Sequence, residues 1–89
     1  MKIRSELTLR KIGDDYLIVE PDQGMVDFSR VFSLNHTAAY LFTQLQGKEF
    51  EIESAQMLLK ERYGITEDVA DRDSKTIIGL FRKENLLYP

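Results

Sequence analysis

Two observations predict an α+β fold, with a three-stranded antiparallel β-meander followed by three α-helices. Up to residue 34, short apolar runs alternate with polar residues and are separated by turn formers, which is typical of strands with one solvent-facing side. From residue 38 onward, apolar residues recur every three or four positions, as on the buried side of a helix. The change of period indicates where the sheet ends and the helices begin.

A hairpin and one further strand make up the expected sheet. The runs at residues 7–12 and 16–20 are rich in apolar and β-branched residues, and the glycine and aspartates of residues 13–15 form a turn sequence between them. A second reversal is expected at residues 21–24, where proline, aspartate and glycine cluster. The third strand then covers residues 26–34, lies at an edge of the sheet, and runs into the first helix without a loop.

Capping residues give the limits of the first two helices. Asn35 can accept a hydrogen bond from the free amides of a helix whose apolar stripe starts at Ala38. Gly47 is well placed as its left-handed C-terminal cap. A second apolar stripe covers residues 52–63, and Gly64 ends that helix just past the last apolar position.

The third helix has an unusually wide apolar side. Thr66 is the expected cap, and the helix should extend to about residue 83. The apolar side spans close to half the circumference and is made by Val69, Ala70, Ile77, Ile78, Leu80 and Phe81. Asp73 falls inside this arc. Because a buried unpaired carboxylate costs several kcal/mol, Asp73 must bond to a neighbouring group or lie at the lip of a groove.

The composition indicates one soluble globular domain over residues 1–89. Hydrophobic residues make up 43% of the chain and charged residues 30%, and no apolar run is long enough to span a membrane. No secretory signal is visible at the start, so we expect a cytoplasmic location. With no cysteine and a single histidine, the sequence predicts neither a metal site nor a cofactor.

His36 is the residue that most invites an enzymatic interpretation, because histidine is the commonest acid–base group. No motif places a serine, cysteine or carboxylate beside it, and the chain has no phosphate-binding glycine loop. The sequence therefore predicts a protein without enzymatic activity. In that interpretation His36 is an ordinary exposed residue at the start of a helix.

A second hypothesis is a winged-helix regulator that binds DNA, since three strands and three helices could form that arrangement. The charge of the third helix disfavours it. Residues 67–84 contain five acidic and four basic side chains, and the whole chain has a net charge of −3. A DNA-binding helix needs several lysines or arginines to contact phosphates.

The expected edge strand offers another use, because an extended peptide could add to the sheet there. Side chains of the peptide would then enter a groove between this strand and the third helix. An alternative stays open, in which the apolar residues of the strand are simply core and the N-terminus of the chain covers the edge. An open edge could also pair with a second copy, so either a monomer or a weak homodimer is expected.

At this point the chain resembles the PqqD-like family, named for the PQQ synthesis protein D and also known as peptide recognition elements of ribosomal peptide natural-product pathways. It is similar to the branch not devoted to PQQ, because residues 47–52 do not follow the Gly-x-x-Ser-Val-like pattern of the PQQ members. The resemblance covers nearly the whole chain. It rests on Val26-Asp27-Phe28, Leu34-Asn35-His36-Thr37-Ala38, Gly47-Lys48, Tyr63-Gly64-Ile65, Asp73, Ile77, Leu80, Phe81 and Leu86-Leu87.

The resemblance implies a winged-helix-like fold that binds the leader segment of a precursor peptide as an added strand, in the groove between the third strand and the third helix. It also implies a partner, most often a radical S-adenosylmethionine (SAM) enzyme or another peptide-modifying enzyme, and neither nucleic acid nor membrane. The module itself would do no chemistry. Carried over by position, the peptide-binding residues would be Val26, Phe28, Arg30, Val31 and Phe32 on the strand and Asp73, Thr76, Ile77 and Leu80 on the helix.

Overall fold

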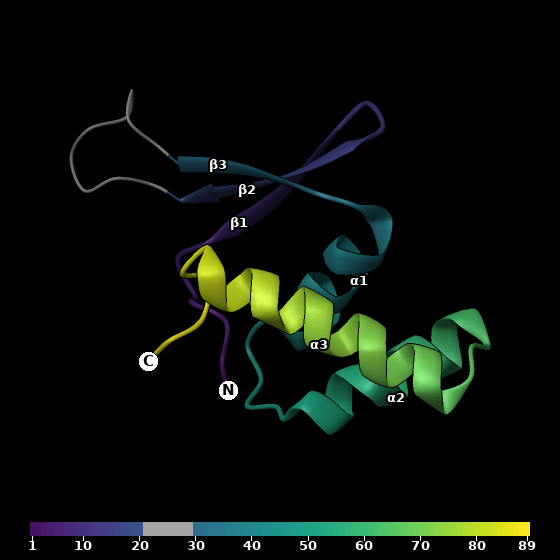
Figure 1. Ribbon diagram of the computed structural model, residues 1–89. Coiled ribbons are helices and arrows are strands. Elements are labelled where there is room, and N and C mark those ends of the chain that lie inside the picture. Colours follow the sequence, from purple (N-terminus) through teal and green to yellow (C-terminus); the bar gives the residue numbers. More distant parts are fainter. Residues whose placement is uncertain (21–29) are drawn as a thin grey trace.

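The computed structural model describes residues 1–20 and 30–89 and confirms the predicted α+β fold. Figure 1 shows helix α3 crossing the molecule between the sheet and helix α2. None of the helices in the described ranges is long and apolar enough to cross a membrane. In chain order the elements are β1 (Thr8–Ile12), β2 (Asp15–Glu20), β3 (Arg30–Leu34), α1 (His36–Leu45), α2 (Ile52–Tyr63) and α3 (Glu67–Lys83).

The three strands form an antiparallel sheet in the order β1-β2-β3, so β3 lies at an edge as predicted. Ile12 pairs with Asp15, which leaves a two-residue turn in which Gly13 has a φ of 61°. A residue without a β-carbon tolerates this φ at low cost. The register of β3 against β2 runs from Tyr16 opposite Leu34 to Glu20 opposite Arg30. The first four residues of the predicted third strand lie outside the described residues.

Local hydrogen bonds at the helix ends confirm the predicted capping residues. The Asn35 side-chain oxygen accepts a hydrogen bond from the Ala38 amide at 2.8 Å, and Thr66 Oγ1 accepts one from the Val69 amide at 3.4 Å. Gly64 ends α2 with a φ of 63°. Gly47 also has a positive φ, of 83°, and follows the C-terminal cap residue of α1. These bonds satisfy backbone groups that a helix end would otherwise leave unpaired.

The hydrophobic core is one cluster of buried residues to which the sheet and the helices α1, α2 and α3 all contribute. Phe42 of α1 and Phe81 of α3 are fully buried, and their rings meet edge to face with centroids 6.2 Å apart. Ile18 contributes from β2 and Leu59 from α2, both also fully buried. Burying an aromatic side chain of this size stabilises the fold by about 2–3 kcal/mol. The Phe42–Phe81 contact therefore ties the first helix to the last.

The two terminal segments pair with each other. Ile3 and Leu87 form an isolated antiparallel bridge, and the Arg4 amide donates to the Leu86 carbonyl at 2.9 Å. Both ends of the chain accordingly lie at the same corner of the molecule (Figure 1). In the described part of the chain, the N-terminal segment thus runs beside the C-terminal segment and not along β3. The alternative in which it covers the edge strand is wrong for these residues.

Polar side chains support this pairing at the surface. The Tyr88 hydroxyl accepts a hydrogen bond from the Ser5 amide at 3.1 Å, and Arg4 Nε donates to Glu6 Oε1 at 2.6 Å. A hydrogen bond from its own backbone amide, together with the bond from Arg4, holds the pKa of the Glu6 carboxyl below its usual value. The carboxylate form is thus favoured beside the paired ends.

We predict that Asn35→Ala lowers the free energy of unfolding by about 1 kcal/mol, because the α1 amide loses its side-chain acceptor. Asn35→Asp keeps an oxygen in the same place and serves as the matched control. Urea denaturation followed by circular dichroism measures both. Equal losses in the two variants would show that the cap does not stabilise the junction.

Candidate functional site

The outer edge of β3 is the first half of the candidate site. In an antiparallel pair, alternate residues direct their backbone N–H and C=O groups to the neighbouring strand, and the remaining ones direct them outward. Within the described residues, β3 pairs with β2 along one edge only. Its other edge thus presents backbone donors and acceptors over Arg30–Leu34.

A hollow of about 90 Å³ between β3 and the last turns of α3 is the second half of the candidate site. Its apolar part comes from three leucines, of which Leu34 ends β3, Leu80 lies on α3 and Leu86 follows α3. Its polar part comes from the Ser33 hydroxyl and the Glu84 carboxylate. The lining residues are Ser33, Leu34, Leu80, Glu84 and Leu86.

A left-handed turn after α3 carries Leu86 into this hollow. Asn85 has a φ of 59°, which asparagine tolerates better than other residues with a side chain. The Asn85 amide donates to the Arg82 carbonyl at 3.1 Å, and the Leu86 amide donates to the Phe81 carbonyl at 2.8 Å. This pair of bonds is the Schellman motif. It reverses the chain and leaves Leu86 fully buried.

The predicted residues of α3 take different positions. Leu80 is 37% exposed and lines the hollow, whereas Ile77 is only 7% exposed and belongs to the core. Thr76 is exposed, and its hydroxyl donates to the Arg72 carbonyl at 3.0 Å. Asp73 is half-buried and accepts a hydrogen bond from Arg72 Nε at 3.2 Å. The expectation that Asp73 bonds to a neighbouring group is thus confirmed.

For the predicted residues of the strand, the backbone pairing with β2 gives their positions. Arg30, Val31 and Phe32 lie in β3, opposite Glu20, Val19 and Ile18 of β2. They supply the edge that the sequence predicted. Val26 and Phe28 lie outside the described residues.

Four lining residues were not among the predicted site residues, namely Ser33, Leu34, Glu84 and Leu86. Part of this set has a signal in the sequence. Glu84 is four residues after Leu80, and residues with this spacing share a helix face. Leu86 follows an asparagine at a helix end, which is a position for a left-handed turn. Ser33 and Leu34 lie at the end of the predicted strand, and only the packing of α3 against it selects them.

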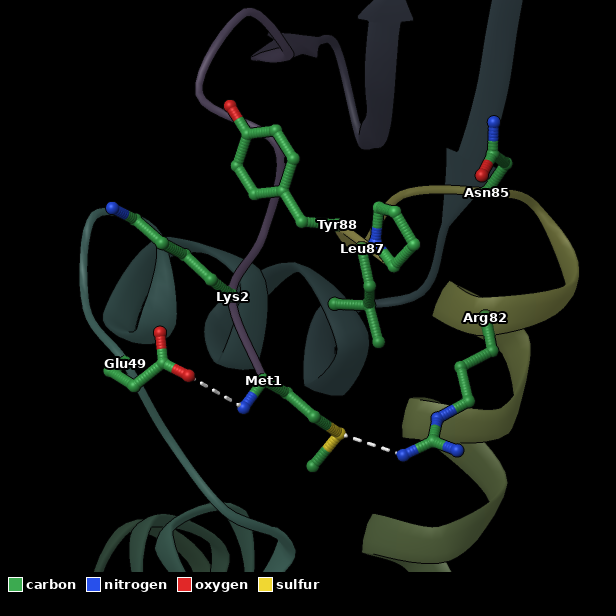
Figure 2. Close-up of a pocket in the computed structure, with 8 residues that line it drawn as sticks. Met1, Lys2, Glu49, Arg82, Asn85, Leu87 and Tyr88 are labelled. Carbon is green, nitrogen blue, oxygen red and sulfur yellow. Dashed lines mark hydrogen bonds and ion pairs between the residues drawn. The ribbon is translucent and has the colours of Figure 1, made fainter.

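A larger hollow, of about 710 Å³, lies between the two terminal segments. The Met1 amino group lies 3.2 Å from Glu49 Oε1, and Arg82 Nη2 lies 3.0 Å from the Met1 sulfur. Figure 2 marks both interactions with dashed lines. Here Ile3 and Leu87 already pair with each other, so this hollow adjoins strand segments whose partners are in place. It lacks the open strand edge that β3 offers. In the described ranges, no group of three histidine, aspartate or glutamate residues could hold a metal ion.

Known proteins share this arrangement of strands and helices. Residues 15–87 match the family described as Coenzyme PQQ synthesis protein D (PqqD). The chain belongs to the PqqD family. The match includes β2, β3 and all three helices, and therefore both halves of the candidate site in this PqqD-family protein. Among curated proteins, none matches the chain.

Two solved structures are similar to this PqqD-family chain. One is described as "TbiB1 in Complex with the TbiA(beta) Leader Peptide"; it is 18% identical, has a TM-score of 0.72, and the match covers 100% of this chain and 99% of that one. The other is described as "Lasso peptide synthetase B1 complexed with the leader peptide"; it is 17% identical with a TM-score of 0.71, and the match covers 99% of this chain and 96% of that one. At these identities the likeness establishes the fold.

We predict that Ile77→Ala and Leu80→Ala have different costs, although the residues are three positions apart on one helix. Ile77→Ala opens a cavity in the core and should lower the free energy of unfolding by about 2–5 kcal/mol. Leu80→Ala removes a partly exposed side chain and should cost less than about 1 kcal/mol. Chemical denaturation measures both values. Similar losses would contradict the placement of Leu80 at the surface hollow.

Proposed function

We propose that this PqqD-family protein binds the leader segment of a ribosomally made precursor peptide as a fourth strand on the outer edge of β3. The observation that carries the proposal is the leucine-lined hollow next to an open strand edge. Two structures with the same fold are described as complexes with a leader peptide, which supports this use of the fold.

Backbone pairing and the hollow would have different tasks. Hydrogen bonds to β3 would hold any extended peptide, since they involve only main-chain groups. Selectivity would come from the hollow, which Leu34, Leu80 and Leu86 make apolar. A volume of about 90 Å³ fits part of one apolar side chain and no more. Burying about half of a leucine or valine side chain there would contribute about 0.8–1.5 kcal/mol, which corresponds to roughly a fourfold to tenfold gain in affinity.

The bound leader would then be presented to a peptide-modifying enzyme, and a radical SAM enzyme is the first candidate to test. In this proposal the chain itself does no chemistry. Its histidine, His36, lies at the start of α1 and contributes no side chain to the hollow beside β3. The reactive groups would belong to the partner.

The charges on α3 argue against the alternative of a DNA-binding regulator. Lys75 Nζ lies 3.0 Å from Asp71 Oδ2, and Arg72 Nε lies 3.2 Å from Asp73 Oδ1. Two of the basic side chains on this helix are therefore partly neutralised by carboxylates of the same helix. Such pairing reduces what remains for phosphate contacts.

We predict that Leu80→Glu weakens leader binding at least tenfold, because it introduces a second carboxylate beside Glu84 in the apolar hollow. The probe is the leader peptide of the cognate precursor, titrated by isothermal calorimetry. Met57→Glu is the matched control, since Met57 is 63% exposed on α2, outside the hollow. Equal affinities in the wild type and in Leu80→Glu would contradict the proposed site.

A further inference from the structure

A second hollow, of about 230 Å³, opens on the outward face of α1. It lies between β2, the first two turns of α1 and the C-terminal end of α2. Three tyrosines, a histidine and an arginine give it a composition unlike that of the groove beside β3. The lining residues are Tyr16, His36, Ala39, Tyr40, Thr43, Arg62 and Tyr63, and none of them lines the hollow beside β3.

Ring contacts hold these side chains in place. The rings of Tyr16 and His36 meet edge to face with centroids 5.0 Å apart, and those of Tyr40 and Tyr63 do so at 6.1 Å. The Arg62 guanidinium lies over the Tyr40 ring, 5.5 Å from its centroid. Contacts of this kind are favourable beyond the apolar area that they bury. The side chains are therefore partly ordered before any ligand arrives.

The charge of this hollow is opposite to that of the chain. The protein has a net charge of −3, yet Arg62 is the charged group among the lining residues and none of them is acidic. A further cation, Lys11 Nζ, lies 5.7 Å from the centroid of the Tyr16 ring. Glu61, although next to Arg62 in the chain, lines a different hollow, between α1 and α2. In the described part of the chain, no carboxylate forms an ion pair with Arg62.

The size and composition fit a segment of another protein better than a small molecule. Pockets for small ligands usually measure about 300–1,000 Å³, and this one is smaller. Tyrosine and arginine are, with tryptophan, the residues enriched where protein interfaces gain most of their binding energy. Tyr63 is 42% exposed, so its ring is available to a partner.

We infer that this tyrosine-lined hollow docks an acidic, extended segment of the peptide-modifying enzyme, with a carboxylate on Arg62 and the segment packed on Tyr40 and Tyr63. The existence of that enzyme rests on the proposed function, but the surface is separate from the leader groove. One face of the protein would then hold the leader while another holds the enzyme.

The test uses a short blocked peptide of alternating glutamate and proline, titrated into isotope-labelled protein by NMR. Proline has no backbone N–H, so this probe is a poor partner for the edge of β3. Aromatic grooves also accept extended proline-containing chains. The matched probe replaces each glutamate by glutamine. The amides of Tyr16, His36 and Tyr63 should shift with the glutamate probe, and the glutamine probe should bind about tenfold more weakly, as expected for loss of a charge-assisted hydrogen bond.

Variants separate this site from general charge effects. Arg62→Gln and Tyr63→Ala should each weaken the glutamate probe at least fivefold and leave leader affinity unchanged. Lys60→Gln removes a neighbouring exposed cation that does not line the hollow, and it should retain binding. Absence of shifts at millimolar probe, equal binding of the two probes, an equal loss in Lys60→Gln, or a loss of leader affinity in Arg62→Gln would each overturn the inference. Leader binding is measured separately, so failure of this inference is distinguishable from failure of the proposed function.

Discussion

The hydrogen bond from the Ala38 amide to the Asn35 side chain is the constraint on which the candidate site depends. α1 starts at His36, so Asn35 is the single residue between it and β3, and no loop is present to absorb a change in either element. The Phe42–Phe81 contact then ties α1 to α3. Together these contacts set the distance between the edge strand and the helix that form the two sides of the hollow. A peptide could pair along β3 only as far as this junction.

Much of the fold was predictable because its signals are local. The capping residues Asn35, Thr66 and Gly64 act within a few positions of themselves, and the strand and helix periods are visible in short windows. The pairing of Ile3 with Leu87 joins opposite ends of the chain and has no local signal. The same limit applies to the site. The wide apolar arc of α3 was visible, but only the packing of the helices decides that Ile77 is core and Leu80 is not.

The protein has two separate surface hollows of different chemistry. The groove beside β3 is apolar and offers main-chain partners, which suits a peptide chosen by one or two side chains. The tyrosine-lined hollow is aromatic and basic, which suits a partner chosen by charge. α1 links them, since its start follows β3 directly and its outward face forms the floor of the second hollow. A protein that presents one partner to another needs two separate surfaces of this kind.

Amide hydrogen exchange along β3 can show whether the leader peptide adds to this edge as a fourth strand. In the free protein, the amides of Arg30–Leu34 that point away from β2 should exchange quickly, and their neighbours slowly. Saturating leader peptide should slow the outward-pointing amides at least tenfold, in an alternating pattern, because each gains a hydrogen-bond acceptor from the added strand. Exchange in β3 that stays unchanged while the leader is bound would show that the peptide does not pair with β3.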